Sequence, residues 1–282
     1  MNDDVTVVIP CFNYGAFLAE CVQSVLEQEG GEPRVIVVDD GSTDAHTLAV
    51  LDRLPPQVEV VHQANGGLSA ARNTGLRLAQ TPYVLALDAD DKLVHDAIAR
   101  LREPLDADAT LGFSYGLMCF FGEWEGVVKM PPYDPYRLLF RHNIGYMALM
   151  RRELFEDVGG YDPEFTGYED WEFWLHALEH GWRGRGIETV TLLYRRHGST
   201  MFMQARSRYR MIFQELTRKH AALYGRAGRR RLARQSELGP AGRLCYRWWW
   251  GRRPLPARVE MALQAVLWRP RGRGQDSPAR ST

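Results

Sequence analysis

The chain has 282 residues, of which 45% are apolar and 25% are charged. This composition is typical of a folded protein and excludes an intrinsically disordered one. The net charge of zero conceals an asymmetry, because residues 201–282 hold 19 Lys and Arg against 4 Asp and Glu, so residues 1–200 are acidic by the same margin. An acidic body argues against nucleic acid as the main ligand, whereas the basic segment could bind an anionic membrane, another protein or the body itself.

The cysteines and the N-terminus predict a cytoplasmic protein. The four cysteines have neither the paired spacing of a zinc site nor the density of a disulfide-linked scaffold, so we expect reduced thiols. The first residues lack the basic and apolar stretches of a signal peptide. No apolar run reaches the ~18–20 residues that span a bilayer. We therefore expect a chain that is not exported and does not cross a membrane.

Short apolar runs alternate with amphipathic segments over the first part of the chain. The runs predict strands at Val5–Ile9, Val35–Val38, Val58–Val61 and Tyr83–Leu87. The amphipathic segments predict helices at Phe17–Glu27, Thr43–Leu54, Leu68–Ala79 and Leu93–Leu101. Uninterrupted apolar strands are typical of a sheet covered on both faces, so the pattern predicts an α/β fold with a mostly parallel sheet flanked by helices. In such sheets the ligand binds at the carboxyl ends of the strands.

The later chain predicts more of the same domain, followed by an extension. Residues 104–165 are irregular and rich in aromatic side chains, and we interpret them as further strands and crossing loops. From Gly167 to His180 the apolar residues recur at helical spacing. Past residue 200 the chain is basic with helical patterning. We expect one domain over residues 1–200 and a basic helical extension over residues 201–282.

Two acidic clusters favour a metal site and a catalytic base. Asp88, Asp90 and Asp91 follow the fourth predicted strand, and Glu169 and Asp170 lie in the first turn of the later helix. Carboxylates gathered at the end of a strand repel one another, so a divalent cation or open solvent must relieve them. The alternative for the first cluster is a solvated turn. The alternative for Asp170 is a carboxylate that stabilises the helix dipole.

Two other turns could contact a nucleotide. Asp40 follows the second strand and could accept a hydrogen bond from a base or a ribose, whereas Thr43 and Asp44 are interpreted as the cap of the next helix. Gly66 and Gly67 open the third helix, and a glycine-rich helix start can receive a phosphate. Arg72, one turn further, could face the nucleotide or a nearby acid, although in isolation it would be taken for a surface charge.

Together these features resemble glycosyltransferase family 2, whose members have the GT-A fold. The matching blocks follow the family's order from Val5 to about His197, and they are Val7–Tyr14, Val38–Asp44, Gly67–Asn73, Leu87–Asp91, Gly160–Asp162, Glu169–Glu172 and Tyr194–His197. Several blocks in one order are more specific than any single motif. The family's Asp-x-Asp motif corresponds to Asp88 and Asp90.

The resemblance implies roles for the matched residues. Those that would bind the nucleotide are Pro10, Phe12, Asn13, Asp40, Arg72 and Asp88. Those that would hold Mn²⁺ or Mg²⁺ are Asp90, Asp91 and His197. Which of Asp88, Asp90 and Asp91 is the direct ligand stays open, and the alternative for His197 is a surface histidine in a mobile loop. Asp170 would be the general base in a single inverting displacement. Glu169 and Trp171 would lie on the acceptor side, although the spacing of Trp171 and Trp174 also fits core packing.

The resemblance implies a metal-dependent, inverting glycosyltransferase that moves one sugar from a nucleotide-sugar donor, UDP-linked, to a saccharide or lipid-linked acceptor in cell-surface polysaccharide or glycolipid synthesis. Trp248–Trp250 and Val259–Trp268 in the basic extension suggest peripheral contact with the inner face of the cell membrane. Packing on the acidic body and a homo-oligomer are the alternatives for this extension.

Two other functions fit the same sheet. A sugar-phosphate nucleotidyltransferase also needs a cation, but the chain has no glycine-rich pyrophosphorylase signature near its start. A non-catalytic nucleotide-sugar-binding module would not require Asp88, Asp90 and Asp170 together. The sequence therefore favours the transferase.

Overall fold

The computed structural model describes residues 2–250 apart from 124, 129, 166 and 198–207. Nine strands in this part of the chain form one sheet in the order β3-β2-β1-β4-β8-β6-β9-β5, with β7 paired to β6. The strands are β1 (Val5–Cys11), β2 (Arg34–Asp39), β3 (Val58–His62), β4 (Tyr83–Ala86), β5 (Lys92–Leu93), β6 (Leu111–Gly122), β7 (Gly126–Val128), β8 (Leu149–Arg151) and β9 (Arg183–Arg196).

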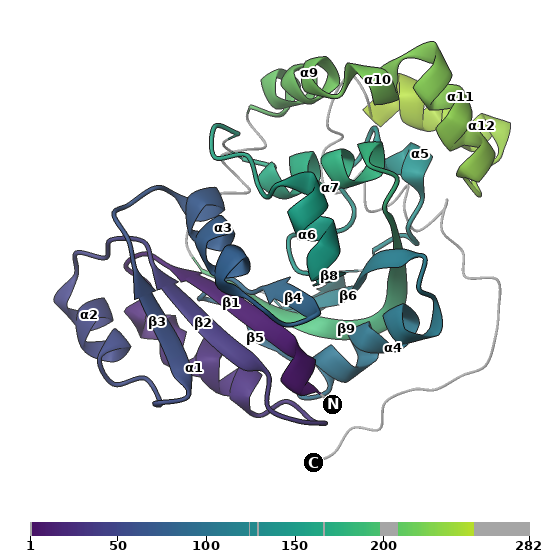
Figure 1. Ribbon diagram of the computed structural model, residues 1–282. Helices are drawn as coiled ribbons and strands as arrows, with labels where there is room; N and C mark the ends of the chain where they lie inside the picture. The colour runs from purple at the N-terminus through teal and green to yellow at the C-terminus, as the bar shows by residue number, and fades with distance from the viewer. Residues whose placement is uncertain (1, 124, 129, 166, 198–207, 251–282) are drawn as a thin grey trace.

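Helices cover the sheet on both faces (Figure 1). Before the C-terminal extension they are α1 (Gly15–Leu26), α2 (Ala45–Leu51), α3 (Leu68–Leu78), α4 (Ala97–Ala107), α5 (Pro135–Leu138), α6 (Arg152–Val158) and α7 (Glu169–Glu179). The extension adds α9 (Tyr209–Lys219), α10 (Ala221–Tyr224), α11 (Arg226–Gln235) and α12 (Pro240–Cys245). Short helical turns, Asn2–Asp4 and Tyr246–Trp250, lie at the two ends of the described chain.

The first four strands are parallel, as the apolar runs predict. β1 pairs with β2 on one side and with β4 on the other, and β3 pairs with β2, all in parallel. Every residue of β1 is buried, which explains why its run of apolar residues is uninterrupted. β8 joins β4 to β6 through antiparallel pairs, and β6 then pairs in parallel with β9. The expected α/β fold with a mostly parallel, curved sheet is confirmed.

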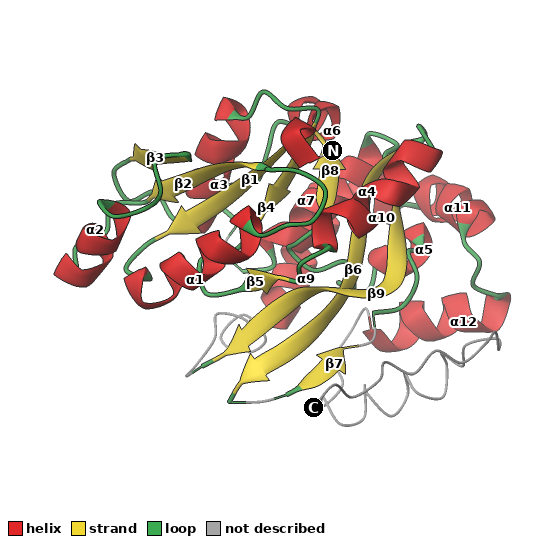
Figure 2. Ribbon diagram, turned by 90° about the horizontal axis from the view of Figure 1, so that it is seen from below, coloured by secondary structure: helices red, strands yellow, loops and turns green. Residues whose placement is uncertain are grey.

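Two hydrophobic cores lie on opposite faces of the sheet. Alternate residues of β1 enter different cores, because successive strand residues point to opposite faces. Val8 packs with residues of α3, α6 and α7. Val7 and Ile9 pack with residues of α1 and α4 on the other side, the side that Figure 2 views. Because helices cover both faces of this sheet, a site is expected at the carboxyl ends of its parallel strands.

The expected helices are found with shifted ends. The helix predicted at Thr43–Leu54 begins at Ala45, because the Asp44 side chain caps it by accepting a hydrogen bond from Thr47 N at 2.9 Å. The prediction of a helix starting at Leu93 is wrong. Lys92 and Leu93 instead form β5, which pairs with Leu192 and Leu193 of β9. That pairing partner lies about a hundred residues away in sequence, so local periodicity carries no signal for it.

The described part of the basic extension lies beside α7 (Figure 1), and its residues contact acidic side chains of that helix. The buried ring of His220 lies 2.8 Å from Glu179 through Nδ1 and 3.2 Å from Glu172 through Nε2. Lys219 Nζ lies 2.7 Å from the same Glu172 carboxylate, itself 1% exposed in its side chain. Buried polar and charged groups are stable only when they are paired, so these contacts fix α9 and α10 against α7.

No helix of the described chain is both long enough and apolar enough for a membrane span. The segment Val259–Trp268 lies outside the described residues.

Gly75→Ala tests how closely α3 packs on β1. A Cβ at residue 75 would lie 2.3 Å from Val8 Cγ1, closer than two carbon atoms can approach. Helix propensity alone would favour alanine by roughly 1 kcal/mol, but overpacking a core costs about 1–3 kcal/mol. We expect urea denaturation to show a lower free energy of unfolding. Gly242→Ala in α12 is the control, since its nearest neighbour would be at 3.6 Å, and it should be neutral or stabilising. A Gly75→Ala variant more stable than wild type would contradict this packing.

Candidate functional site

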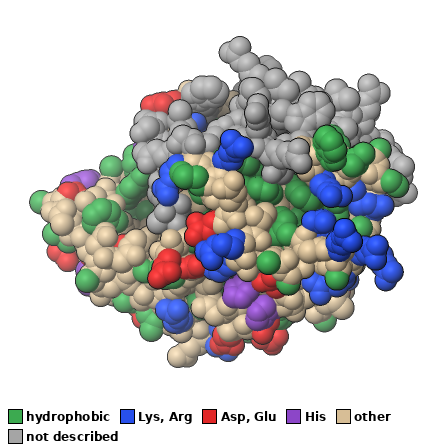
Figure 3. Space-filling model, turned by 90° about the horizontal axis from the view of Figure 1, so that it is seen from above, with side chains coloured by type: hydrophobic (Ala, Val, Ile, Leu, Met, Phe, Trp, Pro, Cys, Tyr) green, Lys and Arg blue, Asp and Glu red, His purple; other side chains and the backbone are tan. Residues whose placement is uncertain are grey.

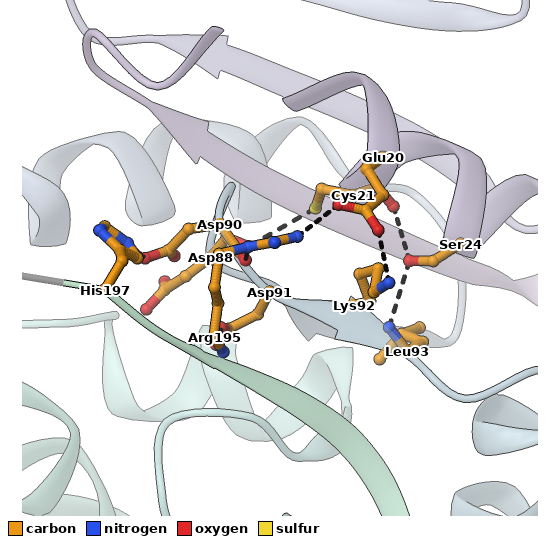
Figure 4. Close-up of polar contacts among 10 residues, drawn as sticks. All are labelled: Glu20, Cys21, Ser24, Asp88, Asp90, Asp91, Lys92, Leu93, Arg195 and His197. Atoms are coloured by element: carbon orange, nitrogen blue, oxygen red, sulfur yellow. Dashed lines mark hydrogen bonds and ion pairs between the residues drawn. The ribbon is translucent and has the colours of Figure 1, made fainter. Parts of the chain in front are cut away.

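The predicted site residues gather where β1, β2 and β4 end. β1 ends at Cys11, which pairs with Asp39 at the end of β2, and the acidic turn Asp88–Asp91 follows β4. The end of β9 crosses this turn and brings Arg195 and His197 to it, as Figure 4 shows. The structure thus joins residues about 185 positions apart in one place, in keeping with binding at the carboxyl ends of parallel strands.

Arg72 is the charged centre of the site. Its side chain is 1% exposed, with Nη2 at 2.6 Å from Asp88 Oδ1 and Nη1 at 3.3 Å from Glu169 Oε1. The guanidinium also lies over the rings of Tyr146 and Tyr161, at 5.2 and 5.4 Å from their centroids. The interpretation of Arg72 as a surface charge is therefore wrong, and its alternative, a position facing a nearby acid, is confirmed.

The buried guanidinium of Arg72 and the partly exposed carboxylate of Asp88 form an ion pair. Burial would lower the pKa of the Arg72 guanidinium, but Asp88, Tyr161 and Glu169 raise it above its ordinary value. Burial raises the pKa of the Asp88 carboxyl more than Arg72 lowers it, and the charge of Asp90 adds to the rise. The 2.6 Å contact has the length of a charge-assisted hydrogen bond between a carboxylate and a guanidinium.

Asp90 and His197 form a pair at the open side of the acidic turn. His197 Nε2 lies 2.9 Å from Asp90 Oδ2, and the two side chains are 35% and 22% exposed. The ring of Phe17 packs on the His197 ring with centroids 4.8 Å apart. A carboxylate oxygen and an imidazole nitrogen are both ligands that Mn²⁺ accepts. The two residues are therefore placed together, partly exposed and suited to a cation.

Asp91 has a different environment from Asp90. It is 1% exposed, and its oxygens accept hydrogen bonds from Tyr146 Oη at 2.5 Å and from Arg195 N at 2.7 Å. Burial, followed by the charges of Asp90 and Asp88, raises the pKa of the Asp91 carboxyl well above its ordinary value. With both oxygens engaged by protein donors, Asp91 fastens β9 to the acidic turn and is a poorer candidate than Asp90 for a metal ligand.

The residues predicted to bind the nucleotide differ in their exposure and in the hydrogen bonds that they already make. Phe12 is 43% exposed and offers an open ring face, whereas Pro10 is buried. Asn13 Oδ1 accepts hydrogen bonds from Thr43 N at 2.8 Å and Asp44 N at 3.1 Å, so it ties the end of β1 to the loop after β2. Of the predicted contacts, Phe12 is the one whose surface is accessible for stacking on a base.

Asp40 holds the turn formed by Gly66 and Gly67 before α3. It is 3% exposed, and its two oxygens accept hydrogen bonds from Gln63 Nε2 and from the backbone N–H groups of Gly66 and Gly67, all at 2.7–2.8 Å. A carboxylate has about four acceptor positions, so these three bonds leave about one for a ligand. The turn before α3 is therefore held in place by the residue predicted to bind the base.

The first turn of α7 places two carboxylates beside Arg72. Tyr168, before the helix, has the left-handed backbone angle φ 59°, which is unfavourable for a side chain of its size and is common at functional sites. Burial and the charge of Asp170 raise the pKa of the Glu169 carboxyl. Burial also raises the pKa of the Asp170 carboxyl, but His142, Arg72 and the Trp171 N–H together lower it below its usual value. Neighbouring carboxyls with opposite shifts suit different roles, and Asp170, whose pKa is lowered, suits a base.

Sequence reasoning missed three contributors to the site and misjudged a fourth. His142 Nε2 lies 3.2 Å from Asp170 Oδ2, and neither His142 nor Tyr146 belongs to a motif that could have identified it. Arg195 lies in the matching block Tyr194–His197, which is the one sequence signal for it, but the sequence assigned it no role. Trp171 is fully buried, with its indole N–H donating to Leu138 O, so the packing alternative describes it and it offers no surface to an acceptor.

Comparisons with known proteins agree with the geometry. Residues 6–168 match the model of the family described as glycosyl transferase family 2. The chain is 27% identical to the protein named "Uncharacterized glycosyltransferase EpsJ" from Bacillus subtilis, over 70% of this chain and 62% of that protein. It is 31% identical to the PGL/p-HBAD biosynthesis glycosyltransferase of Mycobacterium bovis, over 62% of this chain and 70% of that protein.

Solved structures with similar folds include two that contain nucleotide-sugars. S. aureus TarS in complex with UDP-GlcNAc matches with a TM-score of 0.65 at 20% identity, over 86% of this chain and 70% of that chain. The mannosyltransferase PcManGT from Pyrobaculum calidifontis, in complex with GDP-Man and Mn²⁺, matches with a TM-score of 0.60 at 22% identity, over 94% and 80%. At these identities the likeness shows the fold alone, and it confirms the expected GT-A arrangement.

Arg72→Met tests the central ion pair. Removing the guanidinium leaves Asp88 and Glu169, whose side chains are 25% and 12% exposed, without their shared cation. Breaking a fully buried pair costs about 3–5 kcal/mol, and partial exposure of the carboxylates reduces this cost. We expect urea denaturation at neutral pH to show a loss below this limit and larger than that of an exposed pair. The loss should shrink as the pH falls, because protonated carboxyls no longer need a cation.

The control for this prediction is Arg152→Met. Arg152 pairs with Glu156 on the surface of α6, with side chains 37% and 53% exposed. An exposed pair of this kind contributes about 0.5 kcal/mol or less. Equal losses for the two variants would show that Arg72 carries no special share of the stability.

Proposed function

Because this chain belongs to glycosyl transferase family 2, we propose that it moves one sugar from a nucleotide-sugar donor to an acceptor hydroxyl and inverts the anomeric carbon. The observation that carries this proposal is the single guanidinium of Arg72 in contact with both Asp88 and Glu169. It holds the acidic turn, where a diphosphate and its cation would bind, against the carboxylates of α7, where a base is needed. Transfer between a donor and an acceptor requires both halves in one site.

The donor in this proposal is a UDP-sugar. The exposed ring of Phe12 provides a stacking surface for a base, and the remaining acceptor position of Asp40 suits a ring N–H. UDP-GlcNAc in TarS supports this choice, while GDP-Man in PcManGT shows that a similar fold takes another nucleotide. Pro10, Asn13 and Arg72 act on this side by shaping the pocket around the base and ribose.

Mn²⁺ or Mg²⁺ fits the pair formed by Asp90 and His197, with Asp88 beside it. The Asp90 oxygen and the His197 nitrogen converge to 2.9 Å on a partly exposed edge, and they form a donor set that suits Mn²⁺. The described residues contain another group that could hold a metal ion. It consists of Glu29, His95 and Asp96, whose possible ligand atoms all lie within 4.8 Å of one another. We prefer Asp90 and His197, because that exposed group has no diphosphate-binding turn beside it. A bound divalent cation would neutralise charge on the departing diphosphate.

Asp170 is the general base of the proposed reaction. Its carboxylate accepts the proton of the acceptor hydroxyl while the hydroxyl oxygen forms a bond to the anomeric carbon. The bond from that carbon to the diphosphate oxygen breaks, and its electron pair leaves with the nucleoside diphosphate. Glu169 is held by Arg72 and takes no proton from the acceptor. One displacement of this kind inverts the anomeric carbon.

The proposed acceptor is a saccharide or a lipid-linked saccharide in cell-surface glycan synthesis. The name of the mycobacterial relative, a PGL/p-HBAD biosynthesis glycosyltransferase, supports this class. The chain spans 62% of the EpsJ protein and 70% of the mycobacterial one, so the acceptors of those proteins are not carried over.

Asp90→Ala and Asp170→Asn test the reaction with a panel of UDP-, GDP- and dTDP-sugars in Mn²⁺, Mg²⁺ or EDTA. We expect metal-dependent turnover of one donor. Asp170→Asn should lower kcat by about 10²–10⁴-fold, the usual contribution of a general base, and leave donor binding intact. Asp90→Ala should weaken UDP binding in Mn²⁺ and change it little in EDTA.

Asp52→Asn, an exposed residue at the end of α2, is the control and should behave as wild type. Turnover that is unaffected by EDTA would contradict the metal site. Formation of a nucleotide-sugar from a nucleoside triphosphate and a sugar phosphate would identify a nucleotidyltransferase. UDP binding without turnover of any donor, across a panel of acceptors, would favour a binding module.

The basic extension in this proposal also contacts an anionic membrane from the cytoplasmic side. Figure 3 shows Lys and Arg side chains gathered on the side of the molecule that carries α11, where the exposed arginines are Arg226, Arg230, Arg231 and Arg234. We expect wild-type protein to sediment with vesicles that contain anionic lipid and not with neutral ones, less so in high salt. Replacing Arg230 and Arg234 with Glu should abolish sedimentation. A mass of twice the chain in solution, with no vesicle binding, would favour a homo-oligomer instead.

A further inference from the structure

His142 reaches the proposed base from a separate part of the chain. It lies between α5 and β8, and its Nε2 is 3.2 Å from Asp170 Oδ2 at the start of α7. Both side chains are largely enclosed, with 15% and 14% exposure. The contact has the distance of an ion pair, and its angle is not that of a full hydrogen bond. Catalytic pairs are often poorly aligned in this way before the substrate is bound.

Aromatic rings fix the orientation of the His142 ring. Its centroid lies 6.2 Å from that of the buried Trp171 ring, at an interplanar angle of 31°. The ring of Tyr168 meets it edge-on, with centroids 5.9 Å apart. On the other side of the contact, Asp170 Oδ1 accepts a hydrogen bond from Trp171 N at 2.8 Å. Both members of the pair are thus restrained by Trp171, so their approach is built into the packing of α7.

The charges around Asp170 make the contact important. Glu169 from the same helix and Asp88 from the turn after β4 oppose a negative charge there, and Tyr161 lies close enough to be affected by it. Arg72 from α3 and His142 favour the negative charge, and Arg72 is already engaged by Asp88 and Glu169. Among the described residues that affect Asp170, His142 is therefore the one from outside α7 with a nitrogen at ion-pair distance from its carboxylate.

We propose that His142 is a positioning residue for Asp170, whose carboxylate it holds in one orientation and in its ionised form for the acceptor hydroxyl. This inference rests on the proposed function, in which Asp170 is the base. With its proton on Nε2, the ring donates to Oδ2, and the lone pairs left on the carboxylate face the acceptor. The acceptor proton moves to Asp170 alone, so His142 neither gains nor loses a proton in the displacement and touches no substrate.

Removing His142 should change the pH dependence in one direction. The pKa of the Asp170 carboxyl is now below its usual value because His142, Arg72 and the Trp171 N–H outweigh burial. Without His142, fewer groups oppose the effect of burial, so the pKa of Asp170 should rise. A base must be ionised to act, so the acidic limb of the kcat profile should move to higher pH.

His142→Phe and His142→Gln separate positioning from packing. Phenylalanine keeps a ring against Trp171 and Tyr168 but removes the donor, whereas glutamine keeps an N–H donor near the position of Nε2. We expect His142→Phe to lower kcat about 10²-fold, the effect of a misplaced catalytic group, and to move the acidic limb upward. Its KM for the donor and its affinity for UDP with Mn²⁺ should be unchanged. His142→Gln should recover part of kcat and return the limb toward the wild-type position.

A second measurement needs no acceptor. The carboxyl carbon of Asp170, labelled with ¹³C and assigned by its loss in Asp170→Asn, can be titrated by NMR in wild type and in both variants. The midpoint should rise in His142→Phe and less in His142→Gln. His95→Gln is the control, because His95 is 70% exposed and lies away from α7, and it should change neither the midpoint nor kcat. If His142→Phe does not fold, the glutamine variant supplies the comparison.

The outcomes distinguish the two levels of the argument. Transfer that persists in Asp170→Asn would overturn the proposed base and, with it, this inference. Loss of transfer in Asp170→Asn, together with a wild-type kcat, acidic limb and carboxyl midpoint in His142→Phe, would overturn the positioning role alone. A fall in kcat without any shift of the limb or the midpoint would show that His142 contributes only packing.

Discussion

The buried guanidinium of Arg72 is the constraint on which the arrangement of the site depends. A fully buried cation is tolerated only with partners of opposite charge, and its partners come from two distant segments, the turn after β4 and the first turn of α7. The position of α3, which carries Arg72, is set in turn by its packing on β1 at Gly75. Core packing on one face of the sheet therefore decides where two sets of carboxylates meet.

The end of β9 completes the site from the other side. Arg195 donates from its backbone N to Asp91 and from Nε to the carbonyl of Asp90, both at 2.7 Å, and this places His197 against Asp90 (Figure 4). Asp91 uses its oxygens for this attachment, which leaves the more exposed Asp90 for a ligand. Adjacent residues of one acidic turn thus have different tasks, because one points into the protein and the other toward solvent.

Helix α7 connects the proposed base to the basic extension. Its first turn carries Glu169, Asp170 and Glu172, and it ends at Glu179. Glu172 and Glu179 contact the buried His220. The pKa of Glu169 is raised because burial and the charge of Asp170 outweigh Arg72, whereas the pKa of Asp170 is lowered because His142, Arg72 and the Trp171 N–H outweigh burial. The chemistry of this helix start therefore depends on groups from α3 and from the segment before β8 as well as on the helix itself.

Local patterns determined the first half of the fold and pointed to most residues of the candidate site. The apolar runs located β1 to β4, because strands buried on both faces need continuous apolar residues, and the motifs located Asp88, Asp90 and Asp170. They could not locate β5, which exists only through its pairing with β9, nor show that Arg72 is buried. No motif marked His142.

What the sequence determined by itself was which segments are apolar, which turns are acidic and which family's blocks they match. Only the tertiary structure decided which carboxylates share the guanidinium of Arg72, which accept hydrogen bonds from backbone N–H groups and which ring lies beside the proposed base. The physical reason is the separation along the sequence over which each interaction acts. Periodicity and capping act within a few residues, whereas ion pairs, strand pairing and burial join residues far apart, and their energies depend on distances that the fold alone sets.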